Sequence, residues 1–169
     1  MPGPEALESP PRLIQPENAV FQRILVPMDG SQAAECGLRE AIGLAAALQA
    51  ALVLLNVAGD FPLASSDAVS IDATVLETHQ RIGRDILGKG LEAARKAGVP
   101  AEMLVVEAHG HAAWDAIVRQ AVASRCDLIA MGTHGRQGMR RLALGSDAEE
   151  VMARAAMPVL LVRAPVRAG

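Results

Sequence analysis

The sequence predicts an α/β fold in which an open parallel sheet of five strands is covered by helices on both faces. Two observations carry this prediction. Five short apolar segments alternate with four longer segments of helical periodicity, which is the order found in parallel-sheet proteins. The strand segments are apolar at almost every position, as expected of strands buried on both faces. Because only 2% of the residues are aromatic, Ala, Val, Leu and Ile must fill the core.

The first half of the domain is expected to contain two strands and two helices. Residues 23–27 form an apolar run ended by a proline, as in a buried strand that leaves its sheet. Residues 31–50 repeat apolar side chains at helical spacing, and residues 51–57 are apolar almost throughout, which indicates a second strand. A loop is expected from residue 59 to about residue 74. A helix then continues to residue 97, although three glycines weaken its continuity: Gly83, Gly88 and Gly90.

The second half repeats the same alternation. Gly98 and Pro100 end the preceding helix, and residues 101–106 form the third apolar strand. Trp114 begins an apolar stripe that is typical of an amphipathic helix and extends to Val122, so we expect Trp114 to lie in the core. The remaining elements are then a strand, a helix and a strand, at residues 128–131, 147–156 and 158–163.

Composition limits both the domain organisation and the partners. Residues 1–20 contain five prolines and few core-forming residues, so we expect a flexible tail before a single domain at residues 21–165. The net charge of −3 gives no basic footprint for nucleic acid, and no apolar run is long enough to span a membrane. Cys36 and Cys126 lack metal-site spacing and are expected to be buried thiols, which favours a soluble protein of the cytoplasm.

A glycine-rich loop at residues 131–146 is the strongest candidate for a binding site. It connects a buried strand to the start of a helix, where unpaired backbone N–H groups and a partial positive charge favour an anion. Ligands of open parallel sheets bind beyond the carboxyl ends of the strands, where the winding reverses. If the first and fourth strands are neighbours, this loop and residues 27–31 line the same cleft.

The spacing Gly132-x2-Gly135-x9-Gly145-Ser146 resembles the nucleotide-binding signature of the universal stress protein (UspA-like) family. The surrounding residues are similar to that family as well, at Ile24-Leu-Val-Pro27-x-Asp29-x-Ser31, around Gly110, and in the closing segment 157–163. The resemblance covers residues 21–163, which is essentially the whole predicted domain.

The resemblance implies a Rossmann-like sheet with strand order 3-2-1-4-5, ATP as the ligand, and a homodimer formed through the last strand. Its nucleotide-binding residues correspond to particular positions of this chain. Pro27, Asp29 and Val57 would lie at the adenine and ribose, Met131, Gly132 and Gly135 under the ribose and phosphates, and Gly145 and Ser146 at the phosphates. Asp29 is also a candidate ligand for Mg²⁺ bound with the phosphates, although a single carboxylate supplies few of the oxygen ligands of such a site.

Asp147 departs from the family pattern, in which a small or apolar residue commonly follows the signature serine. A carboxylate there would face the phosphates at the helix start and oppose their binding. A second interpretation needs no ligand, because Ser146 and Glu149 have the spacing of a capping box, with Ser146 as N-cap. That interpretation leaves the three glycines unexplained, so the phosphate site is favoured.

The remaining polar residues point to little chemistry. Arg136, Arg140 and Arg141 either add charge to the loop or are solvated, and the histidines lack the partners of a metal site. No base is paired with a nucleophile, and a P-loop is absent. The sequence therefore predicts an ATP-binding, regulatory stress-response protein without strong catalysis, whose ATP hydrolysis is at most slow. The alternative is a dimeric interaction module of the same family that binds no nucleotide.

Overall fold

The computed structural model describes residues 20–59, 73–108, 111–133 and 144–164. Residues 1–19 of the predicted tail and most of the predicted loop at residues 59–74 lie outside the described residues. The strands are β1 (Arg23–Pro27), β2 (Ala51–Ala58), β3 (Ala101–Glu107), β4 (Leu128–Gly132) and β5 (Val159–Val162). The helices are α1 (Gln32–Leu48), α2 (Ala73–Lys96), α3 (Ala113–Ala123) and α4 (Ser146–Arg154). The described helices include none that is both long and apolar enough to cross a membrane.

The five strands form one parallel sheet in the order β3-β2-β1-β4-β5, which confirms the predicted fold class and strand order. β1 lies at the centre and pairs with β2 on one side and with β4 on the other, where Ile24 is in register with Leu128. The chain therefore winds outward in one direction through β2 and β3, and in the opposite direction through β4 and β5. The reversal falls between β1 and β4, which is where ligands bind in sheets of this kind.

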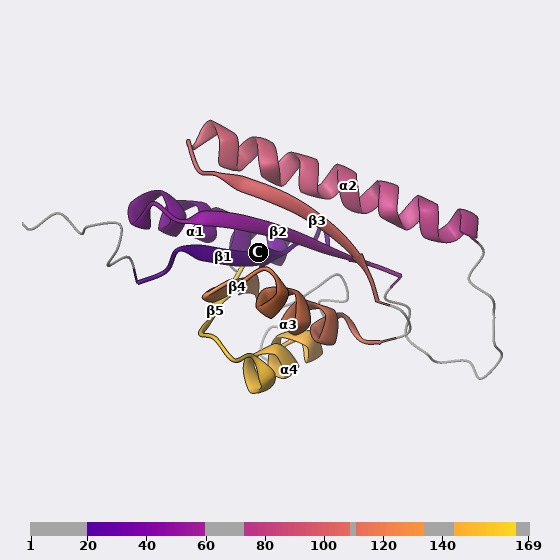
Figure 1. Cartoon of the computed structure of the whole chain (residues 1–169). Coiled ribbons are helices and arrows are strands. Elements are labelled where there is room, and N and C mark those ends of the chain that lie inside the picture. The colour runs from indigo at the N-terminus through magenta and orange to yellow at the C-terminus, as the bar shows by residue number, and fades with distance from the viewer. Residues whose placement is uncertain (1–19, 60–72, 109–110, 134–143, 165–169) are drawn as a thin grey trace, which may run out of the picture.

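Helices cover both faces of the sheet, with α1 and α2 on one face and α3 and α4 on the other (Figure 1). Successive residues of β1 point to opposite faces, so Ile24 and Val26 join the core under α1 and α2 while Leu25 joins the core under α3 and α4. All three side chains are fully buried. The uniformly apolar strand sequence follows from this two-sided burial.

The helix α2 is continuous over 24 residues despite its glycines. A β-carbon at Gly83 would lie 2.3 Å from Oδ1 of Asn56, and one at Gly90 would lie 3.1 Å from Cδ1 of Leu54. These two glycines are seven residues apart, so they share the face of the helix that packs on β2. The close approach of α2 to the sheet requires glycine there, and packing offsets the lower helix propensity.

The start of α1 packs in the same close way against the end of β4. A β-carbon at Gly132 would lie 2.4 Å from the carbonyl oxygen of Ala33, and one at Gly37 would lie 3.0 Å from the backbone nitrogen of Gly132. Gly132 must therefore lack a side chain whether or not a ligand is bound. This contact holds the carboxyl end of β4 against the N-terminal turn of α1.

Candidate functional site

The candidate site lies at the carboxyl edge of the sheet, where β1 and β4 end side by side. Pro27 is the last residue of β1, and Met131 and Gly132 are the last residues of β4. Val57 lies near the end of the neighbouring strand β2 and is half-buried. Because parallel strands end at the same edge, the topology brings these four predicted site residues together.

The segment after β1 is held in a tight turn by its own side chains. One carboxylate oxygen of Asp29 accepts a hydrogen bond from the backbone N–H of Ser31 at 2.9 Å. The hydroxyl of Ser31 accepts from the backbone N–H of Ala34 at 3.1 Å and so caps α1. Gly30 between them adopts a left-handed φ of 81°, which glycine tolerates best. Asp29 is thereby fixed beside the end of β1.

Asn56 also positions this turn, and its role was not predicted from the sequence. Its side chain is only 4% exposed, and its amide donates to the carbonyl of Met28 at 2.7 Å. The backbone N–H of Met28 donates to the carbonyl of Leu55 at 2.7 Å, so β2 holds the turn at two points. The only sequence signal was a single amide side chain within an apolar strand segment.

The helix α4 begins at Ser146, and its N-cap is Gly145. The alternative interpretation, with Ser146 as the N-cap of a capping box, is therefore wrong, because Ser146 is the first helical residue and is exposed. Gly145 supplies no side-chain hydrogen bond to the first turn. Its backbone N–H donates to the carbonyl of Thr133 at 2.8 Å, which attaches the start of α4 to the end of β4. The first turn of α4 thus lacks the side-chain cap that a Ser, Asp or Asn would supply.

Asp147 is directed toward α3. Its Oδ1 accepts a hydrogen bond from the backbone N–H of Trp114 at 3.2 Å. Trp114 is the second residue of α3, whose N-cap Ala112 makes no side-chain cap. One oxygen of Asp147 therefore serves the start of α3 rather than facing a ligand at the start of α4.

Other predicted residues divide into those inside and those outside the described part of the chain. Gly135 and the three loop arginines, Arg136, Arg140 and Arg141, lie outside it. Trp114 is half-buried and packs against the buried cluster under α3 and α4, so it lies at the edge of the core rather than within it. Within the described ranges, no group of three or more His, Cys, Asp or Glu residues is arranged to hold a metal ion.

Both cysteines are buried and free, as predicted. Burial raises the pKa of the Cys126 thiol from 9.0 to about 11, and the nearby charge of Arg23 opposes this rise. A thiol that keeps its proton at neutral pH is a poor nucleophile. Cys126 therefore contributes to packing rather than to chemistry.

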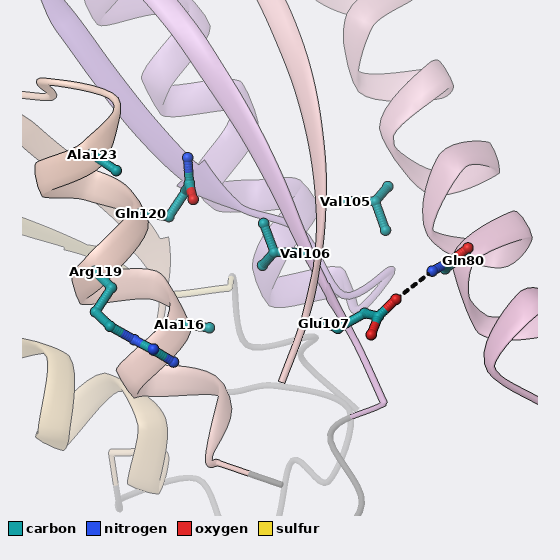
Figure 2. A pocket seen from close by; sticks show the side chains of 8 residues that line it. All are labelled: Gln80, Val105, Val106, Glu107, Ala116, Arg119, Gln120 and Ala123. Carbon is teal, nitrogen blue, oxygen red and sulfur yellow. Dashed lines mark hydrogen bonds between the residues drawn. The ribbon is translucent and has the colours of Figure 1, made fainter. Parts of the chain in front are cut away.

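A groove of about 480 Å³ lies elsewhere, between α3 and the edge strand β3 (Figure 2). Figure 2 shows Val105 and Val106 of β3 pointing to opposite sides of the strand. Gln80 of α2 donates a hydrogen bond to Oε1 of Glu107 at 2.8 Å. Among the described residues that line this groove, none is a predicted nucleotide-binding residue. The described residues of its lining include the carboxylate of Glu107 but no hydroxyl, thiol or imidazole.

Comparison with known proteins identifies the family. The sequence profile of the universal stress protein family matches residues 21–163. The chain belongs to the universal stress protein family. It is 32% identical to a universal stress protein of Methanocaldococcus jannaschii, and the match covers 86% of this chain and 84% of that protein. It is 30% identical to the universal stress protein YxiE of Bacillus subtilis, over 85% of this chain and all of that protein.

Solved structures of universal stress proteins share the fold. One of them is a universal stress protein in complex with cAMP, which is 26% identical to this chain. The two structures superpose with a TM-score of 0.63, over 86% of this universal stress protein and 98% of the solved chain.

Proposed function

We propose that this universal stress protein binds an adenine nucleotide at the carboxyl ends of β1 and β4 and acts in a regulatory stress response. The observation that supports the proposal best is the first turn of α4, which starts at the winding reversal and is attached to β4 through Gly145. Its N-cap residue, Gly145, supplies no side-chain cap. Such a turn presents N–H donors and a partial positive charge to an anion. The relative solved in complex with cAMP supports an adenine nucleotide as that anion.

The proposed contacts follow the geometry of the edge. Pro27, Asp29 and Val57 would surround the adenine and ribose, as the family resemblance implies, since Pro27 ends β1, Asp29 follows it, and Val57 lies next to the last residue of β2. Met131 and Gly132 would lie beneath the ribose and phosphates, together with Gly135. Gly145 and Ser146 would lie against the phosphates at the start of α4, where the N–H of Ser146 is a candidate donor because that of Gly145 is bonded to Thr133. Asp29 is the candidate to hold a Mg²⁺ ion that accompanies ATP.

Nucleotide content and affinity test this proposal directly. The purified protein is denatured, and the released small molecules are separated by chromatography and compared with adenine nucleotide standards. The nucleotide-free protein is then titrated by calorimetry with ATP, cAMP and GTP, and ATP is titrated with and without Mg²⁺. We expect saturable binding of an adenine nucleotide and weaker binding of GTP. Absence of bound nucleotide, and of any binding at millimolar ATP, would favour the nucleotide-free interaction module instead.

We also propose that two copies of the chain form a dimer through β5. We further propose that the protein is located in the cytoplasm. β5 is an edge strand of the sheet, and its residue Leu160 is 36% exposed. An edge strand has unpaired backbone groups and readily pairs with a strand of another chain. The two free cysteines fit a reducing compartment.

A further inference from the structure

We propose that Asp147 is a positioning residue that joins the start of α4 to the start of α3 and so fixes the turn at which the nucleotide phosphates bind. The inference rests on the proposed function, and it assigns Asp147 a role opposite to the one expected from its charge. The sequence alone predicts that this carboxylate repels phosphate. The structure instead gives the carboxylate a partner 33 residues away along the chain.

The helix α3 has no side-chain cap from its own N-cap residue. Ala112 has the extended backbone of an N-cap residue but no side chain that accepts a hydrogen bond. An N-cap side chain normally accepts from the second or third N–H of its helix. Oδ1 of Asp147 accepts from the second N–H, that of Trp114. The carboxylate of α4 therefore replaces the local cap and lies at the positive end of the α3 dipole.

Both ends of α4 contact the same residue of α3. Asp147 in the first turn bonds the backbone of Trp114, and the guanidinium carbon of Arg154 in the last turn lies 4.7 Å from the centroid of its indole ring. Between them, Ala148 and Val151 are buried in the cluster against which Trp114 packs. A shift of this nine-residue helix along α3 would break all of these contacts.

The start of α4, where the phosphates are proposed to bind, is attached to two other elements. The start of α4 is held to β4 by the bond from Gly145 to Thr133, and to α3 by the bond from Trp114 to Asp147. Two attachments on different elements fix the direction of the N–H groups in the first turn, and a fixed donor set binds more tightly than one that must be ordered on binding. Because Asp147 is bonded to α3, its charge is partly offset by that helix end.

Two substitutions of Asp147 separate positioning from repulsion. Asp147→Asn keeps an acceptor oxygen and removes the charge, whereas Asp147→Ala removes both. Loss of one hydrogen bond that orders the site should weaken ATP binding by about two- to ten-fold in Asp147→Ala, measured by calorimetry. Asp147→Asn should bind ATP at least as tightly as the parent. Glu149→Ala is the control, because Glu149 is another acid in the first turn of α4 and is exposed.

A double variant distinguishes positioning from simple capping. In Asp147→Ala, the added change Ala112→Ser restores a local cap to α3 but not its link to α4. In the double variant we expect the stability lost in Asp147→Ala to return, while the ATP affinity stays low. The fluorescence emission of Trp114, the only Trp in a chain without Tyr, should stay at the wavelength that it has in Asp147→Ala. If affinity returns with the local cap, or if Asp147→Ala binds ATP more tightly than the parent, the positioning role is overturned.

The proposed function and this role fail in different ways. If the parent protein binds no adenine nucleotide, both fail together. If the parent binds ATP and Asp147→Ala binds it equally well, only the positioning role fails.

Discussion

At the scale of single residues, the effect of a helical glycine on stability depends on which atoms lie next to the position that its β-carbon would take. At Gly83, α2 passes so close to β2 that a methyl group would lie 2.3 Å from Oδ1 of Asn56, the side chain that holds the turn after β1. At Gly88, on the same helix, nothing lies within 4 Å. Both glycines lower helix propensity equally, so only their packing separates them.

Gly83→Ala and Gly88→Ala should therefore change stability in opposite directions. The added methyl of Gly83→Ala displaces Asn56 from a buried site, and overpacking of this kind costs about 1–3 kcal/mol. Gly88→Ala adds a methyl in open space and should stabilise the helix by about 0.5–1 kcal/mol. Urea unfolding followed by circular dichroism measures both. Equal effects of the two substitutions would contradict the close packing of α2 on Asn56.

The thiol of Cys126 should make stability fall at high pH. Burial raises its pKa from 9.0 to about 11, so between these values the folded protein keeps a proton that the unfolded chain has lost. Stability decreases with pH wherever the folded state binds more protons, so this contribution is present below pH 9 and is lost as the pH approaches 11.

The measurement compares Cys126→Ala with the parent by urea unfolding at pH 8 and at pH 10.5. We expect the free energy of unfolding to fall less over this interval in the variant than in the parent. A difference between the two proteins that is the same at both pH values would show that the thiol does not titrate in this way.

At the scale of elements, apolar periodicity predicted every described strand and helix, with ends that differ from the structure by one or two residues. The N-cap of α4, by contrast, could not be read from the local sequence pattern. The sequence Ser146-Asp-Ala-Glu149 has the spacing of a capping box, yet the helix begins at Ser146 and Gly145 takes the cap position. The reason is tertiary, because the N–H of Gly145 is bound by Thr133 at the end of β4.

The contacts of Asp147 and Asn56 could not be predicted for the same reason. Each side chain bonds a backbone group on another element, 33 and 28 residues away. A local pattern reports on neighbours within a few residues, so it assigned Asp147 to its own helix. The strand order, by contrast, was predicted through the family resemblance, and it was the strand order that brought Pro27 and Met131 to one edge.

The open start of α4 leads to a prediction at this scale. Gly145→Asp places a preferred capping side chain at a backbone conformation (φ −67°, ψ 146°) that suits it. The new carboxylate should stabilise α4 by a few tenths of a kcal/mol and occupy the donors proposed for phosphate. We expect a slightly higher midpoint of thermal unfolding together with at least about ten-fold weaker ATP binding, since like charges repel there. Unchanged ATP affinity in a stabilised variant would place the phosphates elsewhere.

At the scale of the whole molecule, the sheet has two edges, and only the β5 edge is proposed to form the dimer. β3 forms one edge and β5 the other, and each exposes an apolar side chain, with Met103 41% and Leu160 36% exposed. The groove beside β3 is lined partly by polar side chains of α2 and α3, among them Gln80 and Arg119. The proposed dimer uses β5, so the two edges should respond differently to the same substitution.

Leu160→Lys and Met103→Lys make that comparison with one added charge each. A lysine on an edge strand opposes pairing with another strand, because its charge would have to be desolvated within the interface. Light scattering and sedimentation equilibrium across a concentration series should give a dimer for the parent and for Met103→Lys, and mostly monomer for Leu160→Lys. Circular dichroism checks that each variant keeps its fold. A monomer in Met103→Lys with a dimer in Leu160→Lys would move the interface to β3, and a parent that stays monomeric would exclude the dimer altogether.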